Sequence, residues 1–113
     1  MNIQIFGTKK CFDTKKAQRF FKERGIKFQF VDLGQKPMSK GEFNSVCSAV
    51  GGMEKVIDTE KEEFVQVKYL LPEAQRERIL EMPSLFRTPV VREGKRATVG
   101  YCPEVWKRWI EEG

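Results

Sequence analysis

Histidine is absent from this chain of 113 residues. Without an imidazole, the chain cannot build a Cys-His metal site, a Cys-His dyad or a Ser-His-Asp triad, and no metal site is predicted. Long apolar runs are also missing: none approaches the length that spans a bilayer, and the N-terminus lacks the pattern of a signal peptide. We therefore expect a cytoplasmic protein that does not associate with membranes.

Cysteine is scarce, because the chain contains only Cys11, Cys47 and Cys102. An odd number of widely spaced cysteines is not the pattern of a secreted disulfide framework. The length corresponds to one domain, residues 1–113. The net charge of +5 comes from basic residues that are interleaved with acids along the chain. A nucleic-acid-binding face would cluster these charges, so direct binding of nucleic acid is not expected.

The first twenty residues carry the clearest chemical signal. The apolar run from Ile3 to Phe6 predicts a buried strand, and the next four residues turn the chain. Cys11 then lies where a helix begins. The unpaired amides of a helix start favour a thiolate over a thiol, and Lys9 and Lys10 act in the same direction. We expect the pKa of Cys11 to lie below that of a free cysteine; the alternative is an ordinary small residue at a strand-helix corner.

A second strand and a second helix follow. Gly25 ends the first helix, and the apolar residues from Ile26 to Leu33 predict a strand, which completes a right-handed βαβ unit. Ser39 and Glu42 form a capping box at the start of the next helix. Cys47 lies on the apolar stripe of that helix, so we expect it to be a structural residue.

The middle of the chain predicts more helices. One is expected to begin at Thr59 and another to run from Pro72 to Pro83, so that residues 39–83 form a helical insert at one end of a small sheet.

The C-terminal third predicts a β-hairpin and a last helix. Thr88 to Arg92 and Arg96 to Gly100 are the two strands, with Gly94 at positive φ in the turn between them. Pro103 begins the last helix. The predicted order of elements is therefore βα, β, a helical stretch, ββ and α, which is a thioredoxin-like arrangement.

Three short stretches resemble one family. Cys11 is followed by FDTKKA, which resembles the C-D-T-x-K-K-A stretch of arsenate-reductase-like proteins. Residues 85–91, LFRTPVV, resemble the family's L-x-R-P-I-V strand, and residues 99–101, VGY, its V-G-[FY] ending. The helical insert is also what this family adds to a glutaredoxin-like core. The chain is identified as a member of the arsenate reductase (ArsC), Spx and YffB-like family of the thioredoxin-like superfamily.

The resemblance implies a fold and a redox site. The fold is a four-stranded mixed sheet with helices on both faces and a helical subdomain. The bond before Pro89 is expected to be cis and to face Cys11, so that the backbone of Thr88 is presented to a thiol or disulfide partner. Because Thr14 replaces a second cysteine, a disulfide exchange would use one thiol, and glutathione would resolve the mixed disulfide. The Thr14 hydroxyl could donate a hydrogen bond to the thiolate, or belong to a plain helix-surface threonine.

Other residues are candidates for supporting roles. The candidates for binding glutathione or a substrate are Lys9, Lys10, Arg87, Thr88 and Pro89. Alternatively, Lys9 and Lys10 are solvated charges of the loop with no binding role. Cys102 could resolve Cys11, the alternative being an unremarkable helix-start cysteine. Glutathione or a protein thiol or disulfide is the expected partner, and no tightly bound cofactor is expected.

Two alternative functions follow from the same resemblance. An Spx-like regulator would bind RNA polymerase, although the usual C-x-x-C pair is missing here. An arsenate reductase would need three arginines around its cysteine to hold the oxyanion. Thr88 and Cys102 occupy two of these places, and the third falls in residues 57–60, where the sequence offers acids. Efficient arsenate reduction is therefore not expected.

Overall fold

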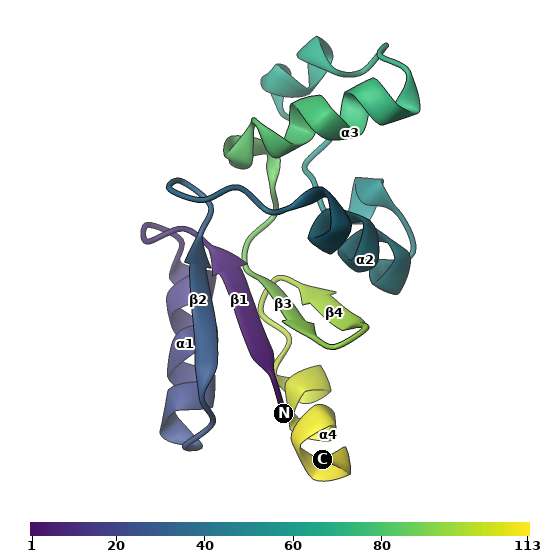
Figure 1. The fold of residues 1–113 in the computed structure, drawn as a ribbon. Helices are drawn as coiled ribbons and strands as arrows, with labels where there is room; N and C mark the ends of the chain where they lie inside the picture. Colours follow the sequence, from purple (N-terminus) through teal and green to yellow (C-terminus); the bar gives the residue numbers. More distant parts are fainter.

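The computed structural model describes all of residues 1–113, and its centre is a four-stranded mixed sheet (Figure 1). The strands are β1 (Ile3–Gly7), β2 (Phe28–Asp32), β3 (Val90–Glu93) and β4 (Arg96–Val99). Their order across the sheet is β2-β1-β3-β4, with β1 parallel to β2 and the other two pairs antiparallel. The predicted βαβ unit and β-hairpin are both confirmed.

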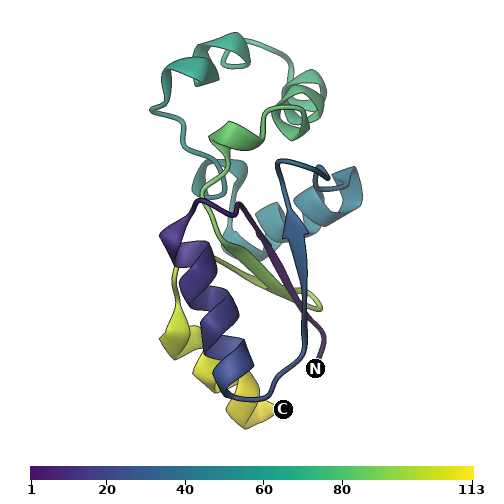
Figure 2. The same cartoon turned by 90° about the vertical axis from the view of Figure 1, so that its left-hand side faces the viewer.

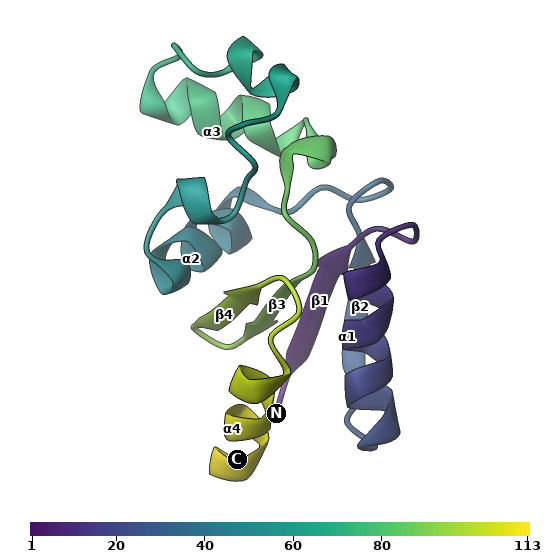
Figure 3. The same ribbon diagram turned by 180° about the vertical axis from the view of Figure 1, so that it is seen from behind.

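Helices cover both faces of this sheet. The α-helices are α1 (Phe12–Glu23), α2 (Lys40–Val50), α3 (Pro72–Leu80) and α4 (Pro103–Glu112). Three short 3-10 helices are η1 (Met53–Lys55), η2 (Glu62–Gln66) and η3 (Pro83–Leu85). Helices α1 and α4 lie on one face and α2 on the other, as the view from behind shows (Figure 3). The four-stranded mixed sheet with helices on both faces is therefore confirmed.

Side chains alternate between the two faces along the central strands. Ile3 and Ile5 of β1 and Val91 of β3 are buried against α1 and α4. Phe6 of β1 and Val90 of β3 point to the opposite face and are buried against α2 and the insert. This alternation follows from the period of two residues in a strand. It produces two separate apolar cores, one on each side of the sheet.

Several helix ends are where local signals predict them. The Ser39 hydroxyl accepts a hydrogen bond from the Glu42 amide at 3.1 Å, and the Glu42 carboxylate accepts one from the Ser39 amide at 2.9 Å. This is the predicted capping box. Gly25 and Gly51 follow helices α1 and α2 with φ of 67° and 93°, a conformation that residues with a Cβ rarely adopt.

The insert differs from its prediction in three details. No helix begins at Thr59; the chain makes turns there, followed by η2. This segment is charged and lacks a 3.6-residue apolar period, so it has no stripe with which an α-helix could pack. Helix α3 ends at Leu80, and Pro83 begins η3 rather than closing α3. Within α3, Ala74 is exposed, whereas Ile79 is fully buried.

Residues 56–58 and 85–87 are two connecting segments that flank η2, α3 and η3, and they pair with each other. Ile57 forms an isolated antiparallel bridge with Phe86. The Asp58 amide donates to the Leu85 carbonyl at 2.7 Å, and the Arg87 amide donates to the Val56 carbonyl at 2.9 Å. The part of the insert between these segments, with η2 and α3, stands beyond the end of the sheet (Figure 2). No helix of the molecule has both the length and the apolar character needed to cross a membrane.

Candidate functional site

Cys11 lies at the N-cap of α1, directly after a short turn that follows β1. The Cys11 amide donates to the Thr8 carbonyl at 3.2 Å, and the Cys11 carbonyl accepts from the Lys15 amide at 3.2 Å. The residue is half-buried, and its backbone is extended with φ of −81° and ψ of 120°. This geometry places the side chain beside the unpaired amides of the first helical turn. The predicted position of Cys11 at a helix start is confirmed.

The surroundings of the sulfur favour the thiolate. Burial raises the pKa of the Cys11 thiol, but polar contacts outweigh it and bring the pKa below its ordinary value. These contacts come from the side chains of Thr14 and Thr88 and from the backbone N–H groups of Thr14 and Asp13. A lower pKa leaves more thiolate at neutral pH, and the thiolate is the nucleophile.

The peptide bond between Thr88 and Pro89 is cis and lies against Cys11. The thiol donates to the Thr88 carbonyl, with 3.6 Å between Cys11 Sγ and the oxygen. Pro89 precedes β3, the neighbour of β1 in the sheet. Residues 77 positions apart in the sequence therefore meet at one end of the sheet. The predicted cis bond and its position opposite the cysteine are confirmed.

Thr14 is buried directly beneath this site. Its side chain is 1% exposed, and its Oγ1 has no well-formed hydrogen bond within the chain. The hydroxyl nevertheless lies close enough to Cys11 to lower its pKa. An unsatisfied buried hydroxyl costs roughly 1–3 kcal/mol of stability. A thiolate at Cys11 would supply an acceptor for this hydroxyl.

Gly7 makes room for Thr14. A Cβ added to Gly7 would lie 2.4 Å from Thr14 Oγ1 and 2.6 Å from its Cγ2, far inside normal contact. The last residue of β1 must therefore be glycine while a threonine occupies position 14. The sequence predicts Gly7 only as part of a turn, because its contact with Thr14 depends on how β1 and α1 pack.

We expect the Thr14→Val variant to react more slowly while keeping its stability. Valine has nearly the same shape but no hydroxyl, so the pKa of Cys11 should rise and its alkylation by iodoacetamide should slow by about tenfold at pH 7. Urea denaturation should show equal or greater stability, because no hydrogen bond is lost while Cys11 is a thiol.

The matched control for this variant is Thr98→Val. Thr98 is also buried, but its Oγ1 accepts a hydrogen bond from Trp106 Nε1 at 2.8 Å. Its removal should lower stability and leave the pH profile of Cys11 alkylation unchanged. An unshifted profile for Thr14→Val would show that this hydroxyl does not support the thiolate.

The predicted basic residues lie in different surroundings. Lys9 and Lys10 are exposed in the turn before Cys11 and take part in no salt bridge. The Arg87 guanidinium is held instead by the insert: its Nε donates to the Ile57 carbonyl at 3.2 Å, and its terminal nitrogen lies 3.8 Å from the Asp58 carboxylate. Their binding of glutathione stays a prediction.

The other two cysteines have environments that disfavour a thiolate. Cys47 is buried in α2, and burial raises its pKa. Cys102 is the half-buried N-cap residue of α4; its thiol donates to the Val99 carbonyl at 3.4 Å, and burial raises its pKa as well. All three cysteines are free thiols. The structural reading of Cys47 agrees with its burial, and the resolving role of Cys102 stays a prediction.

A four-stranded sheet of this order, with a half-buried cysteine facing a cis proline, belongs to the thioredoxin-like class of folds. The model of the ArsC family matches residues 6–109, and the chain belongs to that family. The family resemblance found in the sequence is therefore confirmed.

Individual relatives agree with this assignment. The chain is 28% identical over 106 residues to the global transcriptional regulator Spx 2 of Oceanobacillus iheyensis, covering 89% of this chain and 78% of the relative. Among solved structures, the YFFB protein is 25% identical with a TM-score of 0.78. The match covers 94% of this chain and 96% of the YFFB chain. An arsenate reductase from Vibrio cholerae is 19% identical with a TM-score of 0.81 over 96% and 97% of the two chains, which shows likeness of fold.

Proposed function

We propose that this protein is a thiol-disulfide oxidoreductase that uses Cys11 as its single nucleophile and glutathione as the second thiol. One observation carries the proposal: the only cysteine with a lowered pKa lies against a cis proline, with a threonine in place of a second cysteine. Thr14 supports the thiolate but cannot form a disulfide. In the one-thiol reaction that we propose, glutathione is the external thiol that completes the reaction.

The substrates of the proposed reaction are mixed disulfides between glutathione and a cysteine of another protein. The Cys11 thiolate attacks the glutathione sulfur, a new S–S bond forms, and the substrate cysteine leaves as a thiolate that takes up a proton. A second glutathione thiolate then attacks the glutathione sulfur bound to Cys11. The Cys11 thiolate is released, and oxidised glutathione forms. One substrate disulfide is reduced and one glutathione disulfide is made.

The residues around Cys11 support binding of this co-substrate. Glutathione carries two carboxylates, and the exposed cations of Lys9 and Lys10 precede the nucleophile and form no salt bridge. The Thr88 backbone beside the sulfur offers hydrogen bonds to an extended peptide such as glutathione. Arg87 is already bound to Asp58 and Ile57, so it would have to leave them to contribute. Reduced glutathione is abundant in the cytoplasm, where we place the protein.

A regulator of transcription is the second candidate, because curated relatives of this chain are Spx regulators. Such a protein would bind RNA polymerase and would need no turnover. The Cys11→Ser variant separates the two functions in a pull-down with RNA polymerase. Retained binding favours the regulator, whereas the oxidoreductase requires the thiol.

Mass spectrometry after treatment with oxidised glutathione tests the proposal. We expect one glutathione adduct on the intact protein, mapped to Cys11 by peptide analysis, and its loss on addition of reduced glutathione. Cys47 and Cys102 serve as internal controls, because their raised pKa values should leave them unmodified at pH 7. An unmodified Cys11 under conditions that modify another cysteine would rule out the enzyme function.

A further inference from the structure

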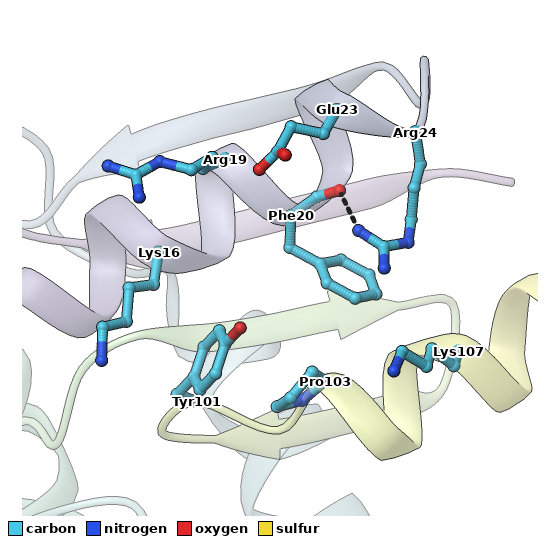
Figure 4. A pocket seen from close by; sticks show the side chains of 8 residues that line it. All are labelled: Lys16, Arg19, Phe20, Glu23, Arg24, Tyr101, Pro103 and Lys107. Atoms are coloured by element: carbon cyan, nitrogen blue, oxygen red, sulfur yellow. Dashed lines mark hydrogen bonds between the residues drawn. The ribbon is translucent and has the colours of Figure 1, made fainter.

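A hollow lies between α1 and the start of α4, on the face of the sheet that carries Cys11 (Figure 4). Its volume is about 450 Å³. Four of the eight residues that line it are cations, namely Lys16, Arg19, Arg24 and Lys107, and Glu23 is the single acid. We call these residues, together with Tyr101, the α1-α4 groove. It takes no part in the thiol chemistry described above.

The cations of the groove are largely uncompensated. Of the seven salt bridges in the molecule, none involves a residue of α1 or Arg24. Of the four cations, Lys107 alone forms a salt bridge, with Glu104 at 3.6 Å on the exposed surface of α4. A set of unpaired like charges around one hollow is costly to assemble and attracts an anionic partner. The groove therefore has the charge of a site for acidic groups.

Aromatic rings hold two of these cations in place. The Arg24 guanidinium lies 3.8 Å from the centre of the Phe20 ring and donates to the Phe20 carbonyl at 3.1 Å. Lys16 Nζ lies 5.4 Å from the centre of the Tyr101 ring. That ring in turn packs edge-on against Trp106, at 5.6 Å between centres. Charges held in position lose less conformational entropy when a ligand binds.

One face of α1 connects the groove to the nucleophile. Phe12, Lys16 and Phe20 are spaced four residues apart and so lie on the same side of the helix. Phe12 follows Cys11 directly and is 77% exposed. The rise of an α-helix places the groove cations, from Lys16 to Arg24, about 8–20 Å along the axis from Cys11, which an extended peptide spans with roughly 2–6 residues.

We propose that the α1-α4 groove docks an acidic polypeptide segment of the protein whose disulfide Cys11 exchanges, with carboxylates roughly 2–6 residues from the exchanging cysteine. This inference rests on the proposed function. Glu23 within the groove favours a polypeptide over a nucleic acid. A phosphate backbone carries a charge at every nucleotide, whereas a peptide can place a backbone N–H beside Glu23 and its carboxylates beside the cations. The exposed Phe12 would contact apolar side chains next to the cysteine.

Three glutathionylated peptides that differ only at positions roughly 2–6 residues from the cysteine test this inference. These positions hold glutamate, glutamine or lysine, and the release of the peptide thiol by the protein and reduced glutathione is followed. We expect the glutamate peptide to react about tenfold faster than the glutamine peptide at low salt, with a preference that declines as salt is added. The lysine peptide should be slowest. Equal rates for all three peptides would overturn the inference.

Charge reversal in the protein supplies the complementary test. Lys16→Glu combined with Arg19→Glu should abolish the preference for glutamate, and both residues are exposed, so folding is retained. Lys55→Glu combined with Lys95→Glu is the control of equal charge change outside the groove, and it should keep the preference. A preference lost equally in both variants would contradict a docking site and indicate only the effect of net charge.

Binding without chemistry distinguishes failure of the groove from failure of the proposed function. A cysteine-free glutamate peptide is titrated into the Cys11→Ser variant, and NMR signals of Tyr101 and Lys16 are followed. Shifts confined to the groove support docking even if Cys11 proves inert towards every disulfide, an outcome that would overturn only the exchange reaction. Absence of shifts, or displacement of the peptide by an oligonucleotide at equal ionic strength, would overturn the docking of a polypeptide.

Discussion

We expect the Cys11→Ser variant to lose thiol-disulfide exchange by at least about three orders of magnitude, because a nucleophile that forms a covalent intermediate has no substitute. Serine fits the same N-cap position and accepts hydrogen bonds from the helix start. The loss should therefore be chemical and not structural. Reduction of a glutathionylated peptide by reduced glutathione, compared with the uncatalysed rate, measures this effect.

The Cys47→Ser and Cys102→Ser variants are the matched controls. Burial raises the pKa of both thiols, so their surroundings disfavour the thiolate. Cys102→Ser should keep the activity of the parent if the reaction uses one thiol. A Cys102→Ser variant that stops at the stage of a stable mixed disulfide would show that Cys102 resolves Cys11. Full activity of Cys11→Ser would remove the oxidoreductase assignment.

We expect the Trp106→Ala variant to lose about 3–5 kcal/mol of stability, the usual cost of removing a large buried aromatic side chain. Trp106 is fully buried on the face of the sheet covered by α1 and α4. Its ring lies 5.3 Å from those of Phe20 and Phe21, and its Nε1 donates to Thr98 Oγ1 at 2.8 Å. Whole domains are stable by roughly 5–15 kcal/mol, so this single change removes a large share.

Urea denaturation followed by circular dichroism measures this loss as a lower midpoint with an unchanged slope. If Trp106→Ala does not fold, Trp106→Phe keeps the experiment quantitative, because phenylalanine fills part of the space and leaves Thr98 without its donor. Phe12→Ala is the aromatic control, since an exposed ring should contribute less than about 0.5 kcal/mol. Similar losses at positions 12 and 106 would contradict the packing of this core.

Local signals account for the parts of the fold that sequence reasoning predicted. The strand before Cys11, the capping box at Ser39, the hairpin around Gly94 and the helix from Pro103 each depend on residues within one short stretch. The cis bond before Pro89 was different, because only the family resemblance implied it. Composition alone favours trans for most X-Pro bonds.

Contacts between distant segments account for what sequence reasoning missed. Residues 59–67 have no apolar period, and their conformation depends on burying Val67 in the core shared with the sheet. The engagement of Arg87 by Asp58 and the contact of Gly7 with Thr14 each require elements that pack only after folding. The α1-α4 groove likewise needs Lys16 and Lys107, which are far apart in the sequence, on neighbouring helices.

The pairing of the two connecting segments has a mechanical consequence. The second segment pairs with the first through Phe86 and Arg87. It continues directly to Thr88, whose carbonyl accepts a hydrogen bond from the Cys11 thiol. The part of the insert with η2 and α3 is joined covalently to the rest of the molecule only through these two segments, and the second leads directly to Thr88. A movement of Thr88 would shift its carbonyl relative to Cys11 Sγ. The hydrogen bond between them would then change, and with it the pKa of the Cys11 thiol. A macromolecule that binds this part of the insert would therefore change the reactivity of the Cys11 thiol without contacting it.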